Sequence, residues 1–142
     1  MARKQSRPEY WTGGHTTHRL RYHIVFTPKY RRRVLDGRLA DRLSELFHEA
    51  CGTRRWQLVE LSIQPDHVHM MIQLSPTDNI SNVMQVLKGR SSFVIRKEFP
   101  ALEEFLWGEH LWADGYFAVT IGAEDEAVVR KYIRNQDTPG YY

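Results

Sequence analysis

The sequence predicts an α+β fold in which an antiparallel sheet carries two helices on one of its faces. In the stretches 21–27 and 67–74, alternate residues divide into two faces, as they do in strands. In the stretches 36–50, 79–99 and 124–136, apolar residues recur at helical spacing. With two further strands, the first six elements follow the order of a ferredoxin-like βαββαβ plait. The third helix, or a ligand, is then left to cover the other face of the sheet.

The predicted strands span residues 21–27, 56–63, 67–74 and 116–121. In the first strand, Tyr22, Ile24 and Phe26 share one face, and Pro28 ends the strand because it has no amide hydrogen for the ladder. The Gln-Pro-Asp sequence at 64–66 is typical of a turn and reverses the chain between the second and third strands. A loop rich in Glu and Trp leads to the fourth strand.

The predicted helices span residues 36–50, 79–99 and 124–136. The first helix is expected to stop at Gly52, since glycine is common just after a helix end. Asp78 is expected to cap the start of the second helix, and Pro100 closes it. The third helix begins with three acidic residues and carries its basic residues later, and both placements favour the helix dipole.

The chain has 142 residues, about the length of one domain, and no repeat or long linker divides it. We expect a flexible N-terminal arm at 1–17, a single domain at 18–137 and a C-terminal tail at 138–142. The one cysteine, Cys51, excludes an internal disulfide and fits a reducing cytoplasm. We expect no signal peptide and no membrane partner, because no stretch approaches the roughly 20 apolar residues that cross a bilayer.

Positive charge is concentrated in the first part of the chain. Residues 1–60 contain 13 Lys and Arg against 6 Asp and Glu, whereas residues 61–142 contain 7 against 11. A basic front half suggests an anionic partner, and a polyphosphate such as a nucleic acid is the commonest one. The alternative is a basic surface that is only solvated.

Two histidines lie on one face of the strand predicted at 67–74. His67 and His69 share this face with Met71 and Gln73, and the two crossover helices should not cover it. Residues two apart on a strand have Cα atoms about 6–7 Å apart, so the two rings can converge on one divalent metal ion. The alternative is that both histidines merely occupy a half-exposed strand, and a bare His-x-His pair favours that alternative.

The last predicted helix carries a tyrosine and a glutamine four residues apart. Tyr132 and Gln136 should present a hydroxyl and an amide in the same direction, and the amide oxygen suits Mg²⁺ or Mn²⁺. A tyrosine with its ordinary pKa of about 10 is a poor nucleophile at neutral pH. Positive charge from Arg130, Lys131 and Arg134 could assist it, and no general base is evident. The alternative is an ordinary core-facing tyrosine and a polar residue at the helix end.

The run QPDHVH at 64–69 resembles the HUH motif (His, bulky apolar, His) of single-tyrosine transposases. These TnpA-type enzymes move small insertion sequences as single-stranded DNA. Three other stretches resemble the family in the same order, namely YHIVFTPKYR at 22–31, VLKGRSS at 86–92 and WADGYFAVTIG at 112–122. Tyr132 and Gln136 follow at the spacing of the family, so that the resemblance covers about residues 18–137.

The resemblance implies a DNA transposase that cleaves and rejoins single-stranded DNA at the ends of an insertion sequence. It makes Tyr132 the nucleophile, which forms a 5′-phosphotyrosine, and it makes His67, His69 and Gln136 the ligands of Mg²⁺ or Mn²⁺. It also implies a homodimer whose active sites are completed in trans by the partner's tyrosine helix. The expected substrate forms imperfect hairpins. The expected location is the cytoplasm of a bacterial or archaeal cell, on the nucleoid when DNA is bound.

Basic residues in three parts of the chain are the expected DNA contacts. Arginine pairs well with phosphate, and Tyr30 could stack on an unpaired base. The alternative, a solvated surface, applies to several of them. The expected contacts are Lys29, Arg31, Arg32, Arg33, Arg54, Arg55, Lys88 and Arg90.

Other functions remain open from the residues alone. One is a non-catalytic plait that binds RNA or single-stranded DNA, although such modules stack bases on sheet aromatics where this chain has histidines. Another is a metal-dependent hydrolase that forms no covalent adduct. A third is a related HUH nuclease that was domesticated to serve repeated extragenic hairpins, or a replication or transfer initiator. The short chain favours transposition.

Overall fold

The computed structural model describes residues 11–13, 16–18 and 20–136. Its strands are β1 (Trp11–Gly13), β2 (Thr16–His18), β3 (Leu20–Phe26), β4 (Gln57–Gln64), β5 (His67–Leu74) and β6 (Phe117–Thr120). Its α-helices are α1 (Gly37–Thr53), α2 (Ile80–Glu98), α3 (Glu103–Leu106) and α4 (Glu126–Arg134). Three short 3₁₀ segments are η1 (Lys29–Arg31), η2 (Pro100–Leu102) and η3 (Ala123–Asp125).

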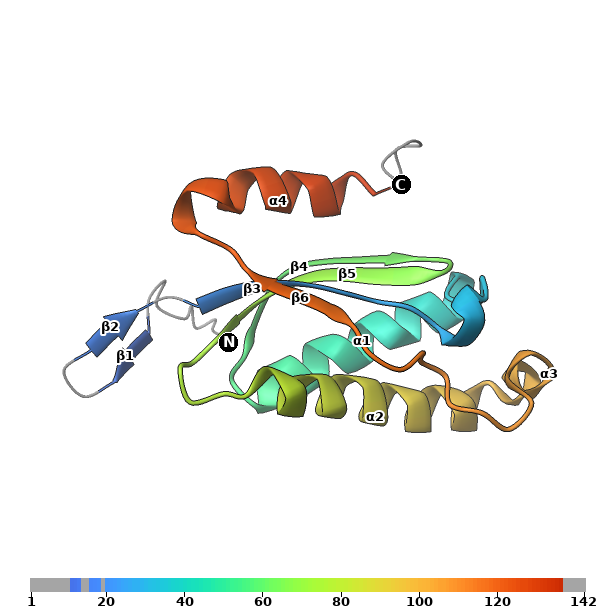
Figure 1. Ribbon diagram of the computed structural model, residues 1–142. Coiled ribbons are helices and arrows are strands. Elements are labelled where there is room, and N and C mark those ends of the chain that lie inside the picture. The colour runs from blue at the N-terminus through green and yellow to red at the C-terminus, as the bar shows by residue number, and fades with distance from the viewer. Residues whose placement is uncertain (1–10, 14–15, 19, 137–142) are drawn as a thin grey trace.

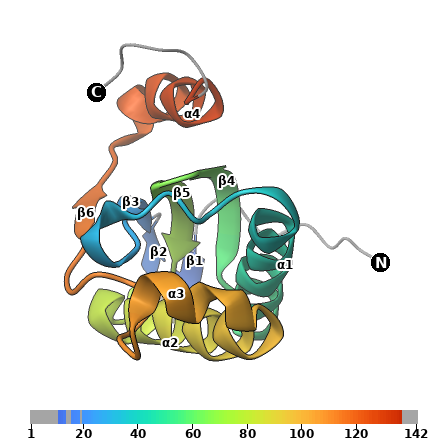
Figure 2. The same cartoon turned by 90° about the vertical axis from the view of Figure 1, so that its right-hand side faces the viewer.

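The larger sheet is antiparallel, with the strand order β4-β5-β3-β6. Helices α1 and α2 lie on one of its faces, and α4 lies over the other (Figure 1). The view turned by 90° shows the same layers, with the sheet between α4 and the pair α1 and α2 (Figure 2). The predicted ferredoxin-like plait is therefore confirmed, and the added C-terminal helix occupies the face that the plait leaves open.

The hydrophobic core fills the space between the sheet and α1 and α2. Alternate residues of the central strand β5 are buried there, as the period of two predicts. Leu43 and Phe47 of α1 and Leu87 of α2 belong to the same buried cluster. The β5 residues in this cluster are Val68, Met70, Ile72 and Leu74. The remaining β5 residues must therefore face α4.

Strand register brings a further histidine to the α4 face. In the antiparallel pairing of β3 with β5, His23 lies opposite Met71 and Val25 lies opposite His69. Residues that are directly opposite point to the same side of a sheet. His23 therefore shares a face with Met71, and hence with His67 and His69.

Several element boundaries differ from the predictions. Asn79, not Asp78, caps α2, since its side chain accepts hydrogen bonds from the amides of Ser81 and Asn82. The Asp78 carboxylate instead accepts one from the amide of Ser75. Gly52 does not stop the first helix. The helix continues to Thr53, and the chain turns through the left-handed conformation of a later residue, Arg55.

The C-terminal helix is shorter than predicted, because its acidic start forms the 3₁₀ segment η3 and α4 ends at Arg134. The pairing of β1 with β2 was not predicted, since residues 1–17 were expected to form an arm. Residues 1–10 of that arm and the tail at 138–142 lie outside the described residues. In the part of the chain that is described, no helix has the length and apolar character to cross a membrane.

Candidate active site

The two histidines of the HUH motif lie on the α4 face of β5, as predicted. The His67 and His69 rings meet edge to face, with centroids 4.9 Å apart. Both residues are buried, with 7% and 2% of their surfaces exposed. The strand is therefore not half-exposed at these two positions, because α4 covers this part of the sheet.

Asp66 holds the ring of His67. Its carboxylate lies 2.7 Å from Nδ1 of His67 and 3.2 Å from the guanidinium of Arg31. Burial alone would raise the pKa of Asp66, but these two partners outweigh it, and the pKa of the carboxyl lies below its usual value. With Nδ1 engaged by a carboxylate, Nε2 is the nitrogen of His67 that is suited to bind a metal.

His23 contacts the second histidine of the motif. Its Nε2 lies 3.1 Å from Nδ1 of His69, and the two rings are nearly parallel, with centroids 5.4 Å apart. Burial lowers the pKa of His69 to about 3, assisted by the nearby His67 and His23, and burial also lowers the pKa of His23. His69 and His23 are therefore neutral at physiological pH. A metal binds the neutral imidazole.

Tyr132 comes to this cluster from α4. Its ring meets His69 edge-on at 5.6 Å and His23 at 6.2 Å between centroids. The structure thus brings the tyrosine and the histidines together within one chain, although they are far apart in sequence. Tyr132 is half-buried, so it is not the ordinary core-facing tyrosine of the alternative.

Gln136 lies two residues beyond the end of α4 rather than within the helix. Its side chain is buried, and its Nε2 donates a hydrogen bond of 2.7 Å to the carbonyl oxygen of Tyr132. This bond ties the amide of Gln136 to the turn of helix that carries the tyrosine. Among the described residues, no group of three or more His, Cys, Asp or Glu side chains is arranged to hold a metal. The amide oxygen of Gln136 as a third metal ligand remains a prediction.

A cavity of about 520 Å³ opens between α4 and the sheet beside Tyr132. Phe117 and Val128 are 51% and 70% exposed, so the cavity reaches solvent. A nucleic-acid strand could therefore approach the tyrosine and His69 from this side. The cavity is lined by His23, Val25, His69, Phe117, Val128, Val129 and Tyr132.

Ion pairs hold α4 over the sheet. Buried Arg21 of β3 pairs with Glu126 at the start of α4, and its Nε donates a 2.8 Å hydrogen bond to the side chain of Gln73. Further along the helix, Glu60 of β4 pairs with Arg130 at 2.9 Å. Arg134 joins the same carboxylate at 3.3 Å. The arginines expected to assist Tyr132 thus pair with the sheet instead, and they position the helix.

Half of the expected DNA contacts have side chains that make polar contacts within the chain, namely Lys29, Arg31, Lys88 and Arg90. Lys29 pairs with Glu109 at 3.4 Å, and Arg90 pairs with Glu49 at 3.4 Å. The Lys88 amine donates to the carbonyl oxygens of residues 113 and 115, which gives it a structural role. Their contacts with DNA remain predictions.

The basic loop itself has an unusual backbone. Tyr30 and Arg31 both have positive φ angles, 58° and 51°, in a region that residues with side chains seldom adopt. Tyr30 is 66% exposed, and the guanidinium of Arg32 lies 5.8 Å from its ring centroid. The loop therefore presents an aromatic ring and a positive charge together to solvent.

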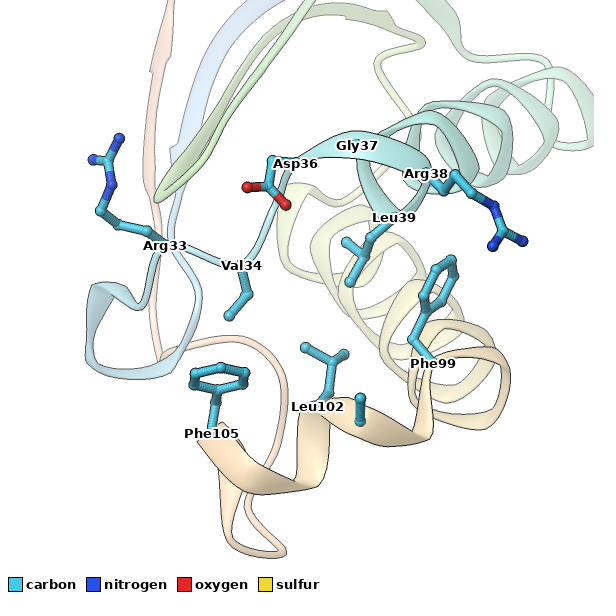
Figure 3. A pocket seen from close by; sticks show the side chains of 10 residues that line it. Arg33, Val34, Asp36, Gly37, Arg38, Leu39, Phe99, Leu102 and Phe105 are labelled. Carbon is cyan, nitrogen blue, oxygen red and sulfur yellow. The ribbon is translucent and has the colours of Figure 1, made fainter.

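A second cavity, of about 450 Å³, lies away from the histidines, between the start of α1 and the segment around η2 and α3. Figure 3 shows Phe99, Leu102 and Phe105 on one side of it and Val34 and Leu39 on the other. Its lining contains no histidine, tyrosine or cysteine. It therefore contains neither the tyrosine nor the histidines predicted for the active site.

Comparisons with known proteins cover nearly the whole chain. Residues 16–136 match the family described as transposase IS200 like. The chain is 32% identical over 119 residues to the ISDra2 transposase TnpA of Deinococcus radiodurans, across 84% of this chain and 85% of that protein. It is 31% identical over 122 residues to the transposase for insertion sequence element IS200 of Salmonella typhimurium, across 86% of this chain and 80% of that protein.

Solved structures show the same likeness. A crystal structure from Deinococcus radiodurans R1, described as a transposase, superposes with a TM-score of 0.74 at 31% identity, covering 89% of this chain and 97% of that one. A REP-associated tyrosine transposase bound to a REP hairpin gives a TM-score of 0.64 at 16% identity, over 99% of this chain and 76% of that one. The second likeness shows the fold alone. Together with the family match, the fold and the HUH motif establish that the chain belongs to the IS200-like family of single-tyrosine transposases, which cleave DNA and transfer its strands.

Proposed function

We propose that this transposase cleaves and rejoins single-stranded DNA through a covalent bond between Tyr132 and a 5′-phosphate. The observation that carries the proposal is the contact of the Tyr132 ring with His69 across the interface between α4 and β5. Tyr132 and the neutral imidazoles of His69 and His23 line one open cavity. The proposed site of action is the DNA of the bacterial or archaeal nucleoid, in the cytoplasm.

The donor set fits a divalent metal. His67 and His69 would each bind it through Nε2, because Asp66 and His23 engage the Nδ1 atoms. The amide oxygen of Gln136 would be the third ligand, and a mixed set of imidazole and oxygen ligands suits Mn²⁺ and is compatible with Mg²⁺. When bound, such an ion neutralises charge on the scissile phosphate and holds that phosphate in line with the attacking oxygen.

The proposed reaction consumes no nucleotide cofactor. The Tyr132 oxygen attacks phosphorus, the bond from phosphorus to the 3′-oxygen breaks, and the leaving oxygen takes up a proton as a 3′-hydroxyl. The proton of the tyrosine passes to solvent. Because the phosphotyrosine is itself a diester, a second 3′-hydroxyl can displace Tyr132 and reseal the strand. The energy of the original bond is conserved, so no phosphate-binding GxxxxGK[ST] loop is needed, and the sequence has none.

The proposed substrate carries imperfect hairpins near the ends of the element. One solved relative of the same fold is described as bound to a REP hairpin. In this chain, the exposed Tyr30 ring and the adjacent Arg32 provide a surface for stacking and for phosphate contact. A non-catalytic plait that only binds nucleic acid would not require the contact between Tyr132 and His69.

The proposed assembly is a homodimer whose sites are completed in trans. β6 is an edge strand of the sheet, and Phe117 and Val119 are exposed on it. The backbone of an edge strand is suited to pairing with a second copy. The structure shows α4 docked within one chain. A helix exchanged between two copies would keep the same contacts, since the partner's sheet is identical.

The function can be tested with labelled single-stranded DNA that bears the end of the element, together with Mg²⁺ or Mn²⁺, on a denaturing gel. We expect a covalent adduct with the wild type, none with Tyr132→Phe, and loss of the adduct with His67→Ala. Duplex DNA should be a poor substrate. Tyr116→Phe is a matched control, because Tyr116 precedes β6 and its hydroxyl contacts Ser81 rather than the histidines. An adduct that survives Tyr132→Phe would move the nucleophile elsewhere and overturn the proposal.

A further inference from the structure

His23 lies next to the HUH motif without belonging to it. It reaches the α4 face from β3, where the register sets it opposite Met71. Its ring lies nearly parallel to the ring of His69, with an angle of 23° between the ring planes. It also meets the rings of Tyr132 and Phe117 edge-on, at 6.2 Å and 5.8 Å. These contacts restrict the orientation of the His23 ring.

One role for His23 would be that of a third imidazole ligand. The described residues argue against it, because no three His, Cys, Asp or Glu side chains among them are arranged to hold one ion. The nitrogen of His23 that faces the site is instead 3.1 Å from Nδ1 of His69, which is hydrogen-bond distance. His23 therefore contacts the ring of His69, a proposed metal ligand, through the nitrogen of that ring that would not bind the ion.

If His69 binds the metal, its contact with His23 determines which nitrogen of His69 carries the proton. A neutral imidazole carries its one proton on either nitrogen, and the metal needs the other. When Nε2 of His69 binds the metal, Nδ1 must carry the proton, and it donates that proton to Nε2 of His23. Asp66 occupies the corresponding position against Nδ1 of His67.

We propose that His23 is a positioning residue that fixes the tautomer and the ring orientation of His69, so that Nε2 of His69 faces the metal. The inference rests on the proposed function and adds a residue to its metal site. Partners of this kind typically change metal affinity by 10–100-fold, roughly, when they are removed.

The test measures Mn²⁺ binding by electron paramagnetic resonance, using the whole chain bound to single-stranded DNA. A Tyr132→Phe background keeps the aromatic ring and prevents turnover. We expect His23→Leu to weaken Mn²⁺ binding by about 10–100-fold. His23→Gln should stay within a few-fold of the parent, because its amide oxygen can accept the proton of His69. His48→Leu is the matched control, since His48 lies on α1 and is exposed.

A second measurement uses chains that retain Tyr132 and follows adduct formation against Mn²⁺ concentration. We expect His23→Leu to require more Mn²⁺ for half-maximal adduct while reaching the same plateau. Unchanged Mn²⁺ affinity in His23→Leu, or equal losses in His23→Leu and His23→Gln, would overturn the inference. If His23→Leu fails to fold by circular dichroism, His23→Asn, whose shorter amide stops short of Nδ1, takes its place with the same expected loss. Failure of the proposed function is distinct, because the wild type itself would then form no adduct.

Discussion

Burial sets the protonation of the residues around Tyr132. His69 has 2% of its surface exposed, and His23 and Tyr132 pack against its ring. Placing a positive charge there would cost solvation energy, so the neutral ring prevails. The neutral ring is also the form that binds a metal. Folding and metal binding therefore favour the same state of His69.

This burial predicts a dependence of stability on pH in the metal-free protein. The pKa of His69 falls from 6.5 to about 3 on folding, so between these values the unfolded chain binds more protons than the folded one. The free energy of unfolding should therefore fall as the pH is lowered through this window, by up to about 1.4 kcal/mol per pH unit from this group. Above the ordinary histidine pKa of 6.5, this loss of stability is absent, because His69 is neutral in both the folded and the unfolded chain. The lowered pKa of His23 acts in the same direction.

Urea unfolding in the presence of a chelator, at several pH values across this window, measures the effect. The His69→Gln variant should show a shallower slope than the wild type. Identical slopes in the two proteins would mean that His69 titrates normally in the fold.

At the residue level, the sequence predicted which face of β5 carries His67 and His69, but it missed residues that only three-dimensional packing brings beside them. His67 and His69 stand in a recognisable run, and their common face follows from the strand period. Asp66 was part of the same run but was assigned only to a turn. The role of His23 depends on the register of β3 against β5, which no local pattern reveals.

At the scale of elements, α4 is held mainly by polar contacts. Only Glu126 and Ile133 of the helix are buried, and Val128 is largely exposed. Arg21 and Glu60 supply its ion pairs with the sheet. The docking of the tyrosine helix should therefore be easier to disturb than the core between the sheet and α1 and α2.

Removing Arg21 should release α4 and leave the sheet intact. Breaking a buried ion pair by removing one partner costs about 3–5 kcal/mol, and undocking limits this cost because Glu126 then reaches water. In Arg21→Met we expect faster hydrogen exchange of α4 amides, unchanged exchange in β5 and a slower rate of adduct formation. Arg96→Met is the control, because Arg96 pairs with Glu103 away from α4. Equal loss of protection in α4 and β5 would show instead that Arg21 supports the whole sheet.

The elements themselves were largely predictable, whereas their ends were not. The strand at His67–Leu74 has the predicted bounds, because its alternation and the turn before it are both strong signals. The start of α2 was misplaced by one residue, since Asp78 and Asn79 are adjacent and both can cap a helix. The last helix stops before Gln136, and sequence spacing alone could not show this.

At the scale of the whole molecule, several basic residues among positions 1–60 form ion pairs with Asp or Glu side chains of the same chain. Arg32 lies 5.8 Å from the centroid of the exposed Tyr30 ring, as Lys29 does at 5.9 Å, but Lys29 is also paired with Glu109. If this loop binds single-stranded DNA, Arg32→Ala should weaken binding and lower the slope of log K against log salt by about 0.7, the value for one phosphate contact. Fluorescence anisotropy across a salt series measures the slope.

Arg42→Ala is the matched control for that titration. Arg42 lies on α1, and its guanidinium is engaged by Glu98 and Glu45. It should leave both the affinity and the salt slope unchanged. Equal effects of the two variants would mean that net charge, rather than the loop, governs binding.

The proposed homodimer can be tested by combining two different inactive variants in one heterodimer. In a heterodimer of a Tyr132→Phe chain and a His67→Ala chain, completion in trans leaves one site with intact histidines and an intact tyrosine. We therefore expect adduct formation from heterodimers purified through two different tags, although each homodimer is inactive. Inactive heterodimers would show that each site is completed within one chain, with the docking of α4 seen in the structure.

The most direct measurement of the central claim identifies the residue that carries DNA. The adduct formed with single-stranded DNA is digested with nuclease and protease, and the modified peptide is sequenced by mass spectrometry. The expected result is a nucleotide joined through its 5′-phosphate to Tyr132. A nucleotide on any other residue, or joined through its 3′-phosphate, would contradict the account.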